Sequence, residues 1–304
     1  MRISPSARLA LLLVSLAGLS ASAHAETEIV PDVVYGHKAG MALTYDVLLP
    51  EPDQRNGAGV LFIVSGAYVS RWFDPATLLN QLNPLGTPFR GLLERGYVLY
   101  IVRHGSAPKF TIVDAVSDVR LAIEHIRSTT AERSVDSRRL GVTGLSAGGH
   151  LSLMLGTMGE TSPDGTTSLE PPVAAVVAWF PPTDITPYAR ALKGDPTMDF
   201  DQRLVDSVSP IRHVDQADAP TLLFHGDQDT TVPIEHSIEI RDAMLAAGVP
   251  VHLETFAGES HRFGIEANLR SFSMMYDFFD EELQGTVDEE TADTPPPGTP
   301  PGQP

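Results

Sequence analysis

The chain has 304 residues and no cysteine, which excludes disulfides, cysteine-based metal sites and cysteine nucleophiles. Its formal net charge is −18 at pH 7, and so acidic a surface argues against nucleic acid or anionic membranes as partners. The length is sufficient for one large α/β domain with a full hydrophobic core.

The two ends of the chain are predicted to lie outside that domain. Arg2 and Arg8 precede the apolar run LALLLVSLAGL, and small residues follow up to Ala25, which is the layout of a secretory signal. We therefore expect residues 1–25 to be removed and the mature protein to be secreted or periplasmic, with no stable membrane insertion. A retained anchor is the alternative, although a spanning helix needs about 20 apolar residues. Residues 285–304 are acidic and proline-rich and are predicted to form a disordered tail.

Short apolar runs alternate with helix-like segments between these ends. The apolar residues of 113–127 recur at helical spacing, whereas 97–104 is a mostly apolar run typical of a buried strand. This alternation predicts an α/β fold, with a mostly parallel sheet of about eight strands and helices on both faces. A hairpin is expected at 33–50, strands at 59–66, 97–104, 139–144, 173–180, 220–226 and 251–257, and helices at 113–127, 148–156, 233–248 and 270–283.

Between one of these strands and its following helix, residues 144–148 read Gly-Leu-Ser-Ala-Gly, a G-x-S-x-G motif. In this setting the motif is typical of a nucleophile elbow, in which a tight turn lifts the serine hydroxyl above the sheet. Ser146 is therefore the candidate nucleophile. The amide of Ala147 begins the helix and is a candidate oxyanion donor. The alternative is a strand–helix junction whose small residues serve packing only.

A serine nucleophile needs a base and a carboxylate that orients the base, here expected in the order serine, acid, histidine. His261 follows the last predicted strand and is the candidate base. Asp227 and Asp229 follow the preceding strand, and Asp184 follows the strand before that, so three carboxylates remain candidates. Three further histidines flank strand ends or the elbow helix and are expected to be packed and hydrogen-bonded: His104, His150 and His225.

The loop after the strand at 59–66 is expected to supply a second oxyanion donor. The backbone amides of Gly66 and Ala67 are the candidates, and an ordinary turn is the alternative. The aromatic side chains of Tyr68, Trp72 and Trp179 either line a pocket or belong to the core and rim.

Taken together, these stretches resemble the α/β-hydrolase superfamily over about residues 58–283. Within it they resemble the esterase/lipase and prolyl-oligopeptidase-like group, particularly secreted acetyl xylan and feruloyl-type carbohydrate esterases. The resemblance implies that the acid of H-G-x-x-D-x-x-V-P falls on Asp229 and the base of G-x-x-H on His261. It also implies an α/β-hydrolase catalytic domain over residues 26–284.

The sequence departs from the family pattern in two loops. The oxyanion loop, usually His-Gly-Gly, reads Ser-Gly-Ala at 65–67, and the loop before the base lacks the usual glycines on either side of the histidine. Arg262, next to the base, either contacts an acidic substrate group or pairs with a surface acid such as Glu259. The long stretch 68–95, which contains prolines, is a candidate partial lid.

We therefore expect a secreted serine hydrolase that cleaves carboxylic esters through an acyl-enzyme. Short acyl groups are expected because no extended apolar cap is apparent, and carbohydrate-linked esters are implied by the resemblance alone. The partner is a small-molecule or polysaccharide ester, no metal or cofactor is required, and the sequence indicates no particular oligomeric state. A prolyl-oligopeptidase-like serine peptidase and a non-catalytic binding module on the same scaffold remain as alternatives.

Overall fold

A computed structural model describes residues 27–80, 88–159 and 170–284. The predicted signal segment 1–25 and the predicted tail 285–304 lie outside these residues, as does part of the stretch proposed as a lid. Within the described ranges, no helix is long and apolar enough to cross a bilayer.

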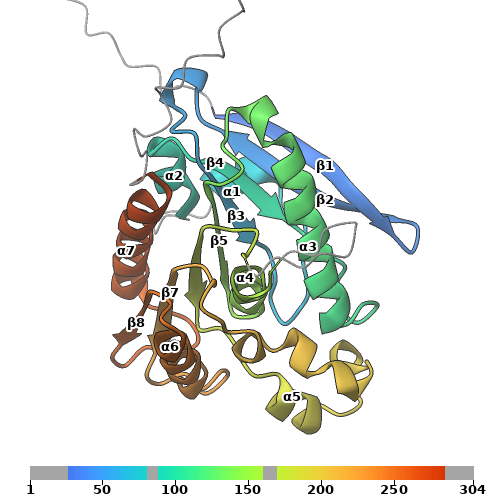
Figure 1. The fold of residues 1–304 in the computed structure, drawn as a ribbon. Coiled ribbons are helices and arrows are strands. Elements are labelled where there is room, and N and C mark those ends of the chain that lie inside the picture. The colour runs from blue at the N-terminus through green and yellow to red at the C-terminus, as the bar shows by residue number, and fades with distance from the viewer. Residues whose placement is uncertain (1–26, 81–87, 160–169, 285–304) are drawn as a thin grey trace, which may run out of the picture.

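One eight-stranded sheet runs through the molecule in the order β1-β2-β4-β3-β5-β6-β7-β8 (Figure 1). The first two strands pair antiparallel with each other, β2 pairs antiparallel with β4, and all later neighbours are parallel. This confirms the predicted mostly parallel sheet and the opening hairpin. The strands are β1 (Glu28–Lys38), β2 (Met41–Leu49), β3 (Gly59–Ile63), β4 (Val98–Val102), β5 (Leu140–Leu145), β6 (Ala175–Trp179), β7 (Thr221–Gly226) and β8 (Val251–Phe256).

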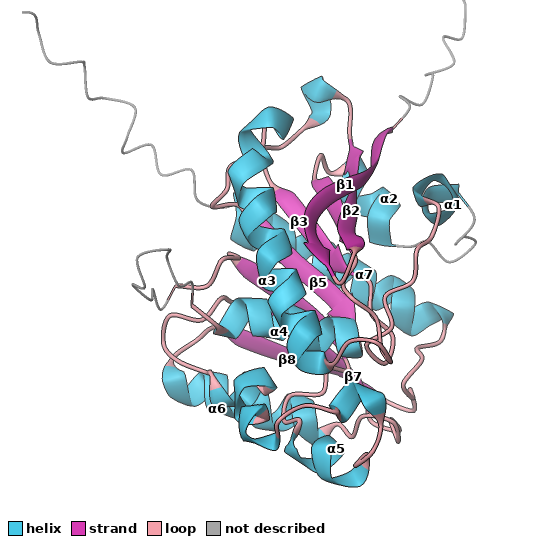
Figure 2. Cartoon of the chain, turned by 90° about the vertical axis from the view of Figure 1, so that its right-hand side faces the viewer, coloured by secondary structure: helices cyan, strands magenta, loops and turns pink. Residues whose placement is uncertain are grey.

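Helices cover both faces of the sheet (Figures 1 and 2). On one face α3, α4 and α6 pack in one hydrophobic cluster, and on the other α2 and α7 pack in a second. The helices are α1 (Pro75–Asn80), α2 (Pro88–Glu94), α3 (Ile112–Thr129), α4 (Ala147–Thr157), α5 (Thr186–Ala191), α6 (Glu235–Ala247) and α7 (Ile265–Gln284).

The central strands explain why the sheet is covered on both sides. Side chains of β6 alternate between the two clusters: Val176 and Ala178 belong to the first, and Ala175, Val177 and Trp179 to the second. Because neighbouring residues of a strand point to opposite faces, a continuous apolar run of this kind has to be buried on both.

The chain order of the strands marks where a site is expected. After β3 the chain adds β4 on one side, and it then returns to add β5 on the other side of β3. The loops after β3 and β5 therefore diverge at a topological switch point, where open α/β sheets bind their ligands. These are the loops that carry Ser65–Ala67 and the Ser146 turn.

A segment of short helices between β6 and β7 was not anticipated from the sequence. It spans residues 182–212, here called the β6–β7 insert, and consists of α5 and four 3-10 turns. Each of these helices is six residues or shorter, and prolines recur along the segment. The sequence therefore shows no helical periodicity here. The insert forms a small wall beside the switch point.

Candidate active site

Ser146 lies in a strained turn that only small neighbours permit. Its backbone has φ 54° and ψ −118°, an unfavourable region for a residue with a side chain. A Cβ at Gly144 would lie 2.5 Å from the backbone of Gly148, and a Cβ at Gly148 would lie 2.5 Å from the carbonyl oxygen of Ile63. The glycines of the motif therefore let β5, α4 and β3 approach closely enough to close the turn.

The structure brings Ser146, His261 and Asp229 into one hydrogen-bonded chain. His261 Nε2 lies 2.9 Å from Ser146 Oγ, and His261 Nδ1 lies 2.7 Å from Asp229 Oδ2. A carboxylate only accepts hydrogen bonds, so Nδ1 carries the hydrogen and Nε2 is left to accept from the serine hydroxyl. This is the geometry in which an imidazole can take the proton of a serine nucleophile.

Asp229 is held for this position by the loop that carries it. Its other oxygen, Oδ1, accepts the backbone amides of Thr231 and Val232 at 2.8 and 2.9 Å, and the carboxylate side chain is fully buried. His225 packs beside it, with Nε2 3.5 Å from Oδ2. Burial lowers the pKa of His225, which therefore stays neutral while it donates to the carbonyl of Val232.

The two alternative carboxylates have other partners. Asp227 accepts the backbone amide of Gly258 at 2.7 Å and so braces the loop before His261. Asp184 accepts the backbone amide of Thr186 and forms an ion pair with Arg212 at 3.1 Å. The choice of Asp229 over both agrees with these contacts.

A cleft of about 920 Å³ opens beside Ser146. Its walls are mostly apolar and come from the loops after β3, β5 and β8 and from the β6–β7 insert. The ring of Phe180 packs against the imidazole of His261, with 4.6 Å between centroids. The insert supplies the apolar wall residues Ile185, Tyr188, Leu192 and Met198.

The three aromatic side chains that the sequence offered as pocket or core residues lie in three different environments. Tyr68 lines the cleft, Trp179 is buried in the core, and Trp72 is 58% exposed and lies outside the cleft lining. Arg262 also lines the cleft. The expected partner of Arg262, Glu259, instead accepts the backbone amide of Gly264 at 2.7 Å.

Hydrogen bonds in the loop after β3 distinguish between the two candidate oxyanion donors there, the amides of Gly66 and Ala67. The amide of Gly66 donates to the carbonyl of Val69 at 3.1 Å, so it is already used within the loop. The amide of Ala67 has no such acceptor among the described residues, and Ala67 lines the cleft together with Ser146 and Ala147. Ala147 is the first residue of α4, where an amide has no partner inside the helix. Ala67 and Ala147 are thus the better pair of donors.

Nothing in the described ranges gathers three or more histidine or acidic side chains that could hold a metal ion.

Comparison with known proteins finds an acylamino-acid-releasing enzyme and esterases among the similar sequences. Acylamino-acid-releasing enzyme of Mus musculus is 26% identical over 282 residues, which cover 82% of this chain and 36% of that protein. Esterase LipQ of Mycobacterium tuberculosis is 25% identical over 211 residues, which cover 64% of this chain and 50% of that protein. The chain therefore spans half or less of the length of these curated relatives.

A solved structure described as a truncated form of carbohydrate esterase from gut microbiota matches with a TM-score of 0.65 and 26% identity, over 86% of this chain and 99% of that one. The BD-FAE family model matches residues 45–244, about two thirds of the sequence, and this span includes Ser146 and Asp229. The protein has the α/β-hydrolase fold of esterases and lipases and belongs to the BD-FAE family.

Proposed function

We propose that the protein hydrolyses carboxylic esters through an acyl-enzyme formed on Ser146. The observation that carries the proposal is the continuous hydrogen-bonded chain from Ser146 Oγ through His261 to the buried Asp229. Membership of the BD-FAE family and the esterases among its relatives support the same reaction class.

In this mechanism Ser146 Oγ attacks the ester carbonyl carbon while its proton passes to His261 Nε2. Asp229 keeps the imidazole in the required tautomer and stabilises its charged form. The amides of Ala147 and Ala67 donate to the oxygen that becomes negative. His261 then gives its proton to the leaving alcohol, and a water molecule, deprotonated by His261, releases the acid and restores Ser146.

We propose esters of short acyl groups, including carbohydrate-linked esters, as substrates. The cleft is within the range of small-molecule sites and has room for an acyl group and part of an alcohol moiety. The likeness to a protein named a carbohydrate esterase supports the carbohydrate link. Export to the periplasm or medium is part of the proposal, supported by the signal-like layout of residues 1–25.

Acyl-peptide hydrolysis is the second candidate. It is favoured by the similarity to acylamino-acid-releasing enzyme, which extends over 82% of this chain. Both reactions would use the same nucleophile, and they differ in the leaving group, an alcohol in one and an amine in the other.

The test is Ser146→Ala, assayed with p-nitrophenyl acetate and with an acetyl-dipeptide anilide. We expect the wild type to prefer the ester, and the variant to lose about a million-fold in kcat, since the nucleophile is removed. Ser273→Ala, which changes an exposed serine on α7, is the matched control and should be unaffected. A fluorophosphonate probe should label the wild type and not the Ser146 variant. Absence of labelling of the folded wild type would instead support a non-catalytic binding module.

A further inference from the structure

The loop after β3 is strained in a way its sequence does not explain. Residues 65–70 form a tight turn in which Gly66 and Val69 exchange backbone hydrogen bonds. The two central residues, Ala67 and Tyr68, have φ values of 49° and 59°. Such turns normally use glycine, asparagine or aspartate at these positions. Contacts from elsewhere in the molecule must therefore hold this loop in place.

Those contacts come from the segment that follows β4. Ser65 Oγ lies 2.9 Å from His104 Nε2 at one end of the loop. At the other end, Ser106 Oγ accepts the amide of Ser70 at 2.9 Å and donates to its carbonyl at 3.0 Å. The loop is thus clamped at both ends, and the amide of Ala107 also donates to the carbonyl of Tyr68 at 3.0 Å. His104 is the clamp on the side of the loop that precedes Ala67.

His104 is fixed in one tautomer by its own surroundings. Nδ1 lies 2.8 Å from the carbonyl oxygen of Gly105, which only accepts, so Nδ1 carries the hydrogen. Nε2 is then an acceptor, and the hydroxyl of Ser65 donates to it. His104 is buried, and burial lowers its pKa, so the neutral form that this arrangement requires is favoured.

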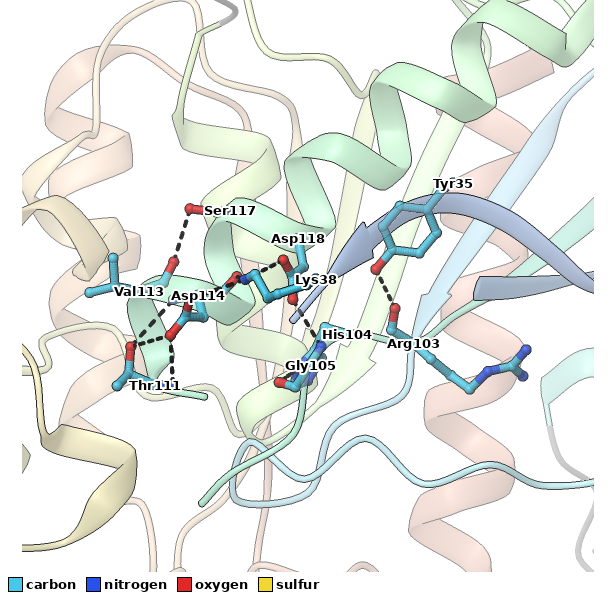
Figure 3. A network of polar contacts seen from close by, with 10 residues as sticks. All are labelled: Tyr35, Lys38, Arg103, His104, Gly105, Thr111, Val113, Asp114, Ser117 and Asp118. Atoms are coloured by element: carbon cyan, nitrogen blue, oxygen red, sulfur yellow. Dashed lines mark hydrogen bonds and ion pairs between the residues drawn. The ribbon is translucent and has the colours of Figure 1, made fainter. Parts of the chain in front are cut away.

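A charged network fixes the segment that carries His104 (Figure 3). The amide of Gly105 donates to Asp118 Oδ2 at 2.9 Å, and the other oxygen of Asp118 pairs with Lys38 Nζ at 2.5 Å. Lys38 also pairs with Asp114 at 3.1 Å. Asp118 is buried on α3 and Lys38 lies on β1, so the backbone next to His104 is anchored to two regular elements.

We propose that His104 is a positioning residue that holds the loop after β3 in the conformation that presents the Ala67 amide to the oxyanion. The loop also lies against the elbow, because a Cβ at Gly148 would be 3.6 Å from the carbonyl oxygen of Ser65. A shift of Ser65 therefore moves the donor relative to Ser146. The inference rests on the proposed ester hydrolysis, and it concerns the transition state rather than substrate binding.

The test compares His104→Ala, Ser65→Ala and the double variant with p-nitrophenyl acetate. Loss of an oxyanion donor costs about a hundred- to a thousand-fold in kcat, and a misplaced donor should cost less, about tenfold, with KM changed by no more than about twofold. Because both side chains act through one hydrogen bond, the double variant should be no slower than the slower single variant. His104→Gln and Ser65→Thr, which keep the polar groups, should recover most of the activity.

A trifluoromethyl ketone supplies a readout that a general structural role would not move. Its affinity depends on the oxyanion donors, so its inhibition constant should rise by the same factor as kcat falls. His252→Ala, which changes an exposed histidine on β8, is the control and should leave both quantities unchanged. If His104→Ala does not fold, Ser65→Ala and Ser65→Thr decide the question alone.

Wild-type kcat in Ser65→Ala, or losses that multiply in the double variant, would overturn the positioning role while leaving the proposed function intact. An inactive wild type with an unlabelled Ser146 would instead overturn the proposed function.

Discussion

The two turns beside the cleft both contain non-glycine residues with positive φ, but different contacts hold them in that conformation. At the elbow, Ser146 has a positive φ and is held by backbone packing, because Gly144 and Gly148 leave no room for any other arrangement. At the facing loop, Ala67 and Tyr68 have positive φ and are held by side-chain and backbone hydrogen bonds to the segment after β4. Packing of backbone against backbone tolerates almost no substitution, whereas hydrogen-bonded side chains can be exchanged for other polar groups.

Of the variants that compare the two turns, Gly148→Ala should lose the most activity, and Gly66→Ala in the facing loop is its counterpart. A Cβ at Gly148 would meet the carbonyl oxygen of Ile63 at 2.5 Å, whereas a Cβ at Gly66 would meet nothing within 4 Å. Displacing Ser146, the proposed nucleophile, should lower kcat by about a hundredfold, and overpacking should lower the free energy of unfolding by about 1–3 kcal/mol. Gly66→Ala should keep activity within about threefold, since its amide is not used as a donor. Equal losses in the two variants would contradict the contrast.

A second test compares the pH dependence of stability that two buried histidines cause. His150 lies on the elbow helix α4, and His104 contacts Ser65 in the facing loop. Burial lowers the pKa of His150 to about 4, and its Nε2 donates to the carbonyl of Val208 at 2.7 Å. An unfolded histidine titrates near 6.5, so the unfolded state binds more protons between pH 6.5 and 4 and stability falls as the pH falls through that window.

Urea unfolding across this window measures the effect. His150 should account for a loss on the order of 3 kcal/mol between pH 6.5 and 4, and His150→Gln should remove that part of the slope. The pKa of His104 is also lowered by burial, so His104→Gln should flatten the same limb. An unchanged slope in His150→Gln would show that the elbow helix does not depend on a neutral imidazole.

The smallest effect is expected for Ala67→Gly. Glycine relieves the positive φ, but it also makes the unfolded chain more flexible, so the free energy of unfolding should change by less than about 1 kcal/mol. The looser loop should lower kcat by about threefold or less, because its ends remain clamped. Ala39 lies in the exposed β1–β2 turn and has φ 48°, so Ala39→Gly is the matched control for the backbone effect alone. A loss of activity shared by both variants would exclude a specific role for the loop.

The same contrast explains what could be predicted from the sequence. The elbow is visible because its geometry demands glycine at fixed offsets from a serine, and the order of Ser146, Asp229 and His261 follows from the topology of the sheet. The packed environments of His104 and His225 were also expected from their places at strand ends, and they agree with the contacts observed.

The conformation of the facing loop, by contrast, could not be predicted from the sequence. The exchange of hydrogen bonds between Gly66 and Val69, which removes the Gly66 amide as a donor, depends on φ values that no residue type at 67 and 68 announces. The contact of Ser65 with His104 joins residues 39 positions apart, in the segments that follow two neighbouring strands, and no local pattern encodes it. The β6–β7 insert was missed because its helices are too short to show a period.

The insert has a consequence for how such enzymes diversify. One uninterrupted stretch of chain, entered after β6 and left before β7, supplies a whole wall of the cleft without contributing Ser146, Asp229 or His261. Grafting the corresponding stretch from a relative would exchange the surface that faces the substrate and leave the reacting groups in place. Selectivity can therefore be recombined as a module, separately from the reaction that the sheet supports.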